Sequence, residues 1–229
     1  WYWPALALLC AVSLLSGYVQ FMEYRAKFLA QGATWAVIWG QGSLMSSMLF
    51  IPLAVGAFTA QSAAGEHEGR NWQRMSASGL AGAMVAGKLL HTAQTALMTA
   101  LVFLTEFVVT GLLLGFDPAE LGPYLARVVP VALSVWVVEV FVMWVGTIAN
   151  SFAAIMSILL LTTIGGFVLS LAAPPVAGLY PLSLITSAFA SRQPDSIASV
   201  GSMLVTGSIA AVWVVFWASA LLRRIARNP

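Results

Sequence analysis

Long apolar runs, each bounded by charged or aromatic residues, follow one another along almost the whole chain. A helix needs roughly 20 apolar residues to cross about 30 Å of hydrocarbon. Backbone groups in lipid must be paired within helices or closed barrels, and runs of this length favour helices. The pattern therefore predicts six membrane-spanning helices, with spans four and five separated by a tight Asn150-Ser151 turn. The predicted spans are residues 4–20, 35–60, 83–114, 128–150, 151–171 and 200–222.

Composition supports a membrane protein and excludes several other classes. The 229 residues are 60% hydrophobic and 8% charged, with a mean hydropathy of +0.92, whereas a soluble domain carries about 25% charged residues. A net charge of +2 is too small for a nucleic-acid footprint. We expect an all-α integral membrane protein that forms a single transmembrane domain over residues 1–229.

The single cysteine and the first residues bear on cofactors and processing. Cys10 lies within the first apolar run, so we expect no intrachain disulfide, no metal site and no cofactor in this chain. The first run is one of many and lacks a basic flank, which argues against a signal peptide. The opening Trp1-Tyr2-Trp3 is expected to form an aromatic belt at the membrane interface, and a further N-terminal segment is expected before it.

The distribution of basic residues predicts the orientation. An even number of spans places both termini on the same face of the membrane. One face then carries Arg70, Arg74, Lys88, Arg223, Arg224 and Arg227, and the other carries Arg25, Lys27, Arg127 and Arg192. Because cytoplasmic loops are enriched in Lys and Arg, we expect both termini in the cytoplasm.

Two segments outside the spans are distinctive. Residues 174–198 are apolar but interrupted by prolines, and they are too short to cross; we expect them to dip into the bilayer from the outer face and return, or to lie in the interface. The residues that mark this segment are Pro174, Pro175, Tyr180 and Pro181. The cytoplasmic segment 61–82 is dense in charge and is either a solvated loop or a docking site. Its candidate contact residues are Glu66, Glu68, Arg70, Asn71, Trp72, Arg74 and Met75, with Lys88 in the following span.

Two carboxyl groups lie inside predicted spans. Glu106 is eighteen residues beyond Lys88, roughly 27 Å along a helix, which places it near the outer boundary, where it is solvated or lines a pathway. Glu139 is twelve residues beyond Arg127, roughly 18 Å, and is therefore expected within the membrane. A carboxyl there is neutral or paired. Structural hydrogen bonding, contact with a cationic or polar substrate, and proton relay all remain open roles for it.

Catalytic motifs do not emerge from the sequence. Residues 82–88 follow the spacing of a phosphate-binding loop, but Leu89 stands where Ser or Thr must reach magnesium, and no strand precedes the motif. His91, near Lys88, is read as an interface hydrogen-bonding residue rather than a metal ligand. We therefore expect a chain that is not an enzyme.

The segment between spans two and three resembles the corresponding connection in ABC-2 type permeases, in particular those of lantibiotic-immunity and peptide-antibiotic exporters. The matching residues are Glu66, Asn71, Trp72, Gly87, Lys88 and Leu89, and the proline-interrupted segment is similar to the re-entrant outer helices of that family. Two features depart from the family: the Pro common after the Trp is absent, and so is the N-terminal interface helix.

The resemblance implies a type V exporter-like permease in the bacterial cytoplasmic membrane. Residues 61–82 would then hold a coupling helix that docks on a separate ABC ATPase, present in two copies, which binds ATP and Mg²⁺. A second permease, identical or homologous, would complete a pathway for an amphiphilic substrate such as a peptide antibiotic, a drug or a lipid-like molecule, with antibiotic resistance or immunity as the expected role. The alternative is a stand-alone secondary transporter or channel, a class that often shows internal repeats and several buried ionisable groups.

Overall fold

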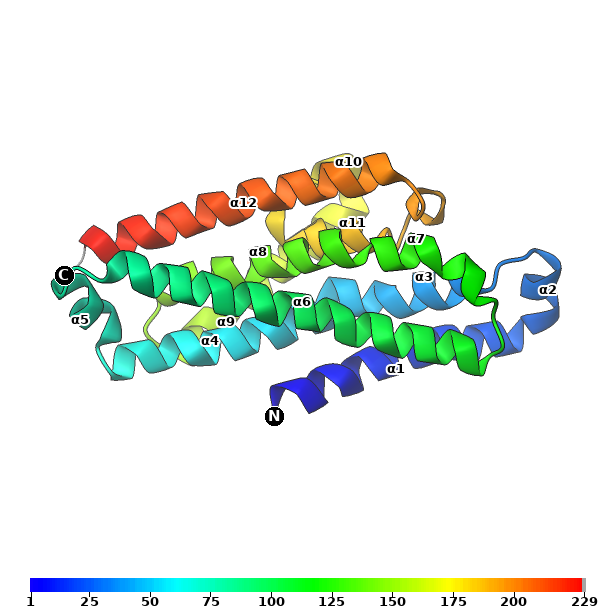
Figure 1. Ribbon diagram of the computed structural model, residues 1–229, viewed down its shortest axis with the longest axis horizontal. Helices are drawn as coiled ribbons and strands as arrows, with labels where there is room; N and C mark the ends of the chain where they lie inside the picture. The colour runs from blue at the N-terminus through cyan, green and yellow to red at the C-terminus, as the bar shows by residue number, and fades with distance from the viewer. Residues whose placement is uncertain (228–229) are drawn as a thin grey trace.

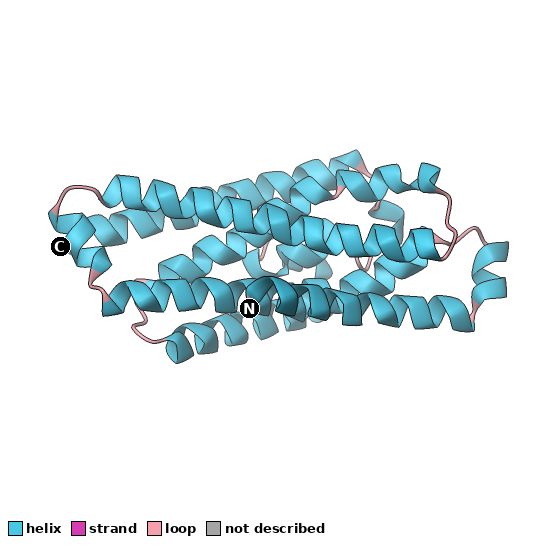
Figure 2. Ribbon diagram, turned by 60° about the horizontal axis from the view of Figure 1, so that its bottom comes forward, coloured by secondary structure: helices cyan, strands magenta, loops and turns pink. Residues whose placement is uncertain are grey.

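The computed structural model describes residues 1–227 and consists of helices joined by short connections, with no strand in that part of the chain. Figures 1 and 2 show an elongated bundle whose long helices run roughly parallel to one axis. The long helices are α1 (Tyr2–Glu23), α3 (Trp35–Met45) continued by η1 (Ser46–Phe50) and α4 (Ile51–Glu68), α6 (Ala81–Leu113), α8 (Val128–Gly146), α9 (Phe152–Ala172) and α12 (Val200–Arg227). The short ones are α2 (Arg25–Ala30), α5 (Asn71–Ala77), η2 (Pro118–Leu121), α7 (Gly122–Ala126), α10 (Pro174–Ala177), η3 (Pro181–Ser183), α11 (Leu184–Phe189) and η4 (Pro194–Ser196).

The prediction of six spans is confirmed: the described residues contain six helical segments long and apolar enough to cross a membrane. Leu, Val, Ile and Phe side chains on the outside of α1, α6, α9 and α12 are exposed. In water such a surface would be strongly unfavourable, whereas in a bilayer it faces hydrocarbon. The chain is therefore a multi-pass membrane protein.

The helix α8 occupies the centre of the bundle. It packs against α4, α6 and α12, and thirteen of its nineteen residues are buried. Its sequence is apolar on every side, which is the pattern of a helix surrounded by other helices. By contrast, α9 and α12 lie at the outside, since most of their span residues are exposed.

The second, fourth and fifth spans differ at their boundaries from the sequence-based spans. The second span continues as helix through Glu68, so residues 61–68 belong to α4 rather than to a cytoplasmic loop. The fourth span ends at Gly146 instead of residue 150, and the expected Asn150-Ser151 turn becomes a connection over residues 147–151. The Ser151 hydroxyl caps α9 by accepting a hydrogen bond from the backbone N–H of Ala154 at 3.3 Å. Such a cap pairs an N–H that would otherwise be free at the start of the helix.

The second span contains an irregular turn near its middle. Residues Ser46–Phe50 form a single π-helical turn directly before Pro52. Proline has no backbone N–H and its ring clashes with the carbonyl four residues earlier, so a regular α-helix cannot continue through this position. The wider turn accommodates the proline, and such turns occur often at functional sites.

Close helix contacts depend on small residues. A Cβ atom on Gly42 would lie 2.5 Å from the Leu14 side chain of α1, and one on Gly56 would lie 2.0 Å from Leu159 of α9. These glycines let α3 and α4 approach their neighbours closely, as small residues commonly do between membrane helices. Gly42 and Gly56 therefore serve helix packing.

The two ends of the bundle carry different elements. Figure 1 shows α5 and the C-terminus at one end and α2 at the other, while α1 begins part-way along the bundle. The aromatic residues Trp1 and Tyr2 pack on Phe58 of α4, so the expected interfacial belt does not lie at the end of the bundle.

We predict that a membrane-impermeant maleimide distinguishes these ends. In a Cys10→Ala chain in sealed vesicles, Gln73→Cys and Arg223→Cys should react from one side, and Lys27→Cys and Glu120→Cys from the other. All four positions are exposed. Gln73 and Arg223 lie at the end of the bundle that carries α5, and Lys27 and Glu120 lie at the other end, so the spans place the two pairs on opposite sides of the membrane. Labelling of all four from the same side would contradict this arrangement.

Candidate functional site

The helix α5 lies across the end of the bundle, between α4 and α6. The chain leaves α4 at Glu68, and Arg70 adopts a left-handed conformation with φ of 50°. A non-glycine residue rarely occupies this region, because its Cβ crowds the backbone. The strained turn at Arg70 reverses the chain and directs α5 across the helix ends, where α4, α6 and α12 contact it.

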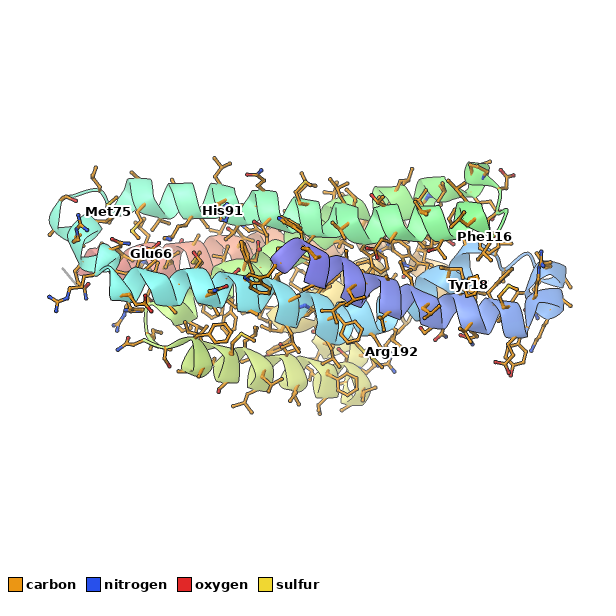
Figure 3. All side chains as sticks on the ribbon, turned by 90° about the horizontal axis from the view of Figure 1, so that it is seen from below. Tyr18, Glu66, Met75, His91, Phe116 and Arg192 are labelled. Atoms are coloured by element: carbon orange, nitrogen blue, oxygen red, sulfur yellow. The ribbon has the colours of Figure 1, made fainter. Side chains whose placement is uncertain are left out.

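An ion pair joins the helices on either side of α5. The Lys88 Nζ donates to Glu66 Oε1 at 2.5 Å, and both side chains are mostly buried. Lys88 also lies 5.2 Å from the centre of the Trp72 ring, a cation–π distance. Figure 3 shows Glu66 and Met75 together at this end of the bundle. The structure therefore brings together Glu66, Trp72 and Lys88, which belong to three successive helices.

The position of Trp72 corrects the expectation that it is a surface anchor. Its side chain is 6% exposed and its ring centre lies 6.4 Å from that of His67, whose Nε2 is in turn 2.5 Å from the carbonyl oxygen of Gly146. Trp72 thus fixes α5 to its own bundle, because the apolar ring is buried against α4 and α6 and is not available to a partner.

The outward side of this region is polar. The exposed side chains here are Glu68, Arg70, Gln73 and Arg74, while Asn71 and Met75 are half-buried. Polar and Arg-rich surfaces around a fixed helix suit a rim of hydrogen bonds and ion pairs with another protein. Of the residues expected to contact a partner, those on this face can do so directly, whereas Glu66, Trp72 and Lys88 support the helix from beneath.

The centre of the bundle contains an unpaired carboxyl group. Glu139 on α8 is 0% exposed, and neither of its carboxyl oxygens has a hydrogen-bond partner among the described residues. Burying an unpaired charge costs far more than burying a neutral group. No hydroxyl or amide of the described residues pairs with this carboxyl, and the neutral form fits this environment.

Glu106 lies nearer the opposite end of α6, seven residues before that helix ends at Leu113. It is half-buried, and its Oε2 is enclosed without a partner in the described chain. Its backbone carbonyl accepts from the Thr110 hydroxyl at 2.7 Å. Glu106 and Glu139 are on different helices and no interaction joins them, so they do not form a carboxyl pair.

Residues 174–198 fold back along α9. The Tyr180 hydroxyl donates to the backbone carbonyl of Thr162 at 3.0 Å, although α9 continues for ten more residues, roughly 15 Å, beyond Thr162. Further on, the Arg192 guanidinium donates to Ser170 O at 2.7 Å. The chain has by then returned to the end of α9, so these residues form a hairpin-like turn within the length of the bundle.

The proline residues mark the descending part of this hairpin. Pro174 and Pro175 begin α10 and are exposed, while Pro181 begins η3 and is buried. Proline at the first position of a short helix loses no hydrogen bond, since the first N–H groups are unpaired in any case. The returning helix α11 is almost completely buried against α8, α12 and the π turn.

Arg127 holds the returning part of the hairpin and was not among the site residues expected from the sequence. Its side chain is 0% exposed and donates to the carbonyl oxygens of Ala188 at 3.0 Å, Ile197 at 3.1 Å and Ser196. In sequence Arg127 looks like a boundary charge. Only its isolation before a charge-free run of eleven residues hinted at a buried role.

The second span completes the attachment of the hairpin. Trp39 Nε1 donates to Phe189 O at 2.7 Å, and Ser43 Oγ donates to Ser191 Oγ at 2.9 Å. Ser47, within the π turn, shares a 3.2 Å hydrogen bond with the same serine. The hairpin, the π turn and Arg127 therefore form one connected polar network in the half of the bundle away from α5.

Comparison with protein-family models finds no match, and comparisons with curated proteins and with solved structures also find none. Within the described residues, no group of three His, Cys, Asp or Glu side chains is placed to hold a metal ion.

We predict that Arg127→Met strongly destabilises the protein. The substitution leaves three buried carbonyl groups unpaired, a loss of roughly 3 kcal/mol or more, and should lower Tm in detergent by about 6 °C or more. The control is Arg192→Met, which removes one carbonyl contact of an exposed side chain. Equal Tm values for the two variants would show that Arg127 does not hold the hairpin.

We predict that Glu139→Gln leaves folding unchanged. A neutral amide of the same size replaces a neutral carboxyl, so yield and Tm in detergent should match the wild type, whereas Glu139→Lys introduces a buried unpaired cation and should abolish folded protein. Size-exclusion chromatography and thermal unfolding measure both variants. A large fall in Tm for Glu139→Gln would indicate that the carboxyl is charged and paired.

Proposed function

We propose that this chain is the membrane-spanning subunit of an ATP-driven exporter of the ABC-2 type. A second permease, identical or homologous, would complete the pathway, and two copies of a separate cytoplasmic ABC ATPase would bind ATP and Mg²⁺. The substrate would be amphiphilic: a peptide antibiotic, a drug or a lipid-like molecule. The proposed location is the bacterial plasma membrane.

The observation that carries this proposal is the placement of α5. A short helix that is fixed across the ends of two long spans can transmit a displacement imposed by a partner directly to those spans. The mostly buried ion pair of Lys88 with Glu66 joins α6 to α4. The enclosed Trp72 of α5 packs against Lys88 and His67 of these two helices, so motion of α5 would move both helices. Its exposed side carries Gln73 and Arg74 for a docking surface.

Charge supports the orientation. Arg70, Arg74 and Arg223 lie at the α5 end of the bundle, and basic residues concentrate on cytoplasmic faces. This end would face the cytoplasm, where an ATPase is found. The C-terminus lies there too, and α1 runs away from this end, so the N-terminal side of α1 would face the cytoplasm as well. Arg227, counted in the same basic cluster, has a side chain outside the described part of the structure.

The hairpin supports the same assignment. It folds back within the length of the bundle next to α9, as a re-entrant segment of an exporter would at the outer face. Non-helical backbone is tolerated at membrane depth only where it is buried in protein or lines a cavity. The carbonyl contacts of Arg127 and Trp39 meet this requirement.

A stand-alone secondary transporter is the second candidate. Such proteins often have interrupted helices and intramembrane carboxyl groups, and the π turn of the second span and the unpaired Glu139 are features of that kind. Transport in sealed vesicles without ATP would favour this candidate, whereas strict dependence on ATP and a partner ATPase would exclude it.

We predict that the exposed side of α5 binds the ATPase. Mass spectrometry of the intact complex, purified gently from the native host, should show a P-loop ATPase at two copies per two permeases. Arg74→Glu reverses an exposed charge and should reduce ATPase recovery by about tenfold. Arg25→Glu makes the same charge change on α2 at the opposite end and is the matched control. Equal ATPase recovery with both variants would reject this docking surface.

A further inference from the structure

An open groove lies on the side of the bundle between α9 and α12. Although these helices are the last two spans, they make no substantial contact with each other within the described chain. The groove between them has a volume of about 430 Å³, within the range typical of small-molecule sites. Its walls are formed by Thr162 and Leu169 of α9, by Val176 and Leu179 of the hairpin, and by Trp213 and Trp217 of α12.

The lining of the groove is mostly apolar, and three of its four polar side chains are hydrogen-bonded, while the Nε1 of Trp217 is enclosed without a partner in the described chain. Trp213 Nε1 donates to Leu179 O at 2.9 Å, and the Tyr180 hydroxyl is bonded to the backbone of α9. These bonds turn the polar tips toward the protein backbone and leave the ring surfaces for the groove. Phe141 of α8 forms the floor, with its ring centre 5.1 Å from that of Trp217.

The groove lies at the depth of the hydrocarbon core. Trp213 is thirteen residues beyond the start of α12, roughly 20 Å along the helix. Trp217 is ten residues before the end of α12, roughly 15 Å from it. The exposed apolar side chains of α9 and α12 continue on either side, including Leu161 and Phe216. The groove is thus continuous with the lipid-facing surface, where water does not fill an apolar recess.

We propose that this groove binds one acyl chain of a membrane phospholipid and retains it as a specific ligand. A recess among rings and aliphatic side chains gives a methylene chain contacts on several sides, whereas an ordinary lipid touches a helix surface on one side only. Each additional carbon–carbon contact adds dispersion attraction that the surrounding lipid does not supply as densely, so the chain in the groove exchanges more slowly than its neighbours. This assignment does not depend on ATP, on a partner ATPase or on the direction of transport.

The test fills the groove by substitution. Val176→Trp places an indole at a groove position that is 53% exposed, and Leu161→Trp places the same bulk on α9 at a position 71% exposed and outside the groove. Each chain is reconstituted in phosphatidylethanolamine and phosphatidylglycerol vesicles, extracted in mild detergent, and analysed by native mass spectrometry. Matching Tm values and elution volumes establish that both variants are folded.

The expected result is one retained phospholipid per wild-type chain and no change in Leu161→Trp. Val176→Trp should retain about tenfold less, the loss expected when the indole displaces about ten carbon–carbon contacts. Equal retention in both variants would overturn the proposal, as would the absence of retained phospholipid in the wild type. Efficient cross-linking of Val176→Cys between two chains, in a Cys10→Ala background, would also overturn it, because a second copy would then cover the groove.

Discussion

The backbone of the hairpin depends on a single buried guanidinium group. Inside a bundle that spans a membrane, every carbonyl outside a regular helix needs a donor, because no water is available to supply one. Arg127 donates to three such carbonyls at the returning end of the hairpin. Its planar group with five N–H donors can serve several acceptors at once, which a lysine cannot do. Without it, three buried carbonyls of residues 188–197 would lose their donors, and only the contacts from the second span would hold this segment by hydrogen bonds.

The π turn and the hairpin depend on each other. Pro52 prevents a regular helix at the middle of the second span, and the wider turn that results presents Ser47 to Ser191. Trp39 and Ser43, which precede Ser47 in the same span, donate hydrogen bonds to the same part of the hairpin. A shift of the second span would therefore be felt in the hairpin, and the second span ends in the turn that carries α5. These contacts form a continuous path from the α5 end of the second span to the hairpin in the other half of the bundle.

The two ends of the molecule use charge in different ways. At the α5 end, Lys88 is enclosed between Glu66 and the face of the Trp72 ring, so its charge is balanced within the chain, while Arg74 remains exposed. Near the middle of the bundle, Glu139 has no balancing group among the described residues. Burying a charge without a partner costs far more free energy than burying a neutral group. Protonation of Glu139, hydration or a bound cation would therefore change the stability of the bundle.

The pattern of apolar runs was sufficient to predict an all-helical chain with six spans, because a membrane imposes a fixed length and a fixed polarity on each helix. The prolines in residues 174–198 indicated a segment that does not cross the membrane. The charged residues around Trp72 indicated another segment outside the spans. The pattern did not reveal that α4 continues to Glu68, because a helix can continue through polar residues after it leaves the membrane. It also misplaced Trp72 and overlooked Arg127, because burial depends on which helices meet. Sequence position alone describes Arg127 as a boundary charge; only the tertiary structure shows three carbonyls from a segment some sixty to seventy residues away converging on it.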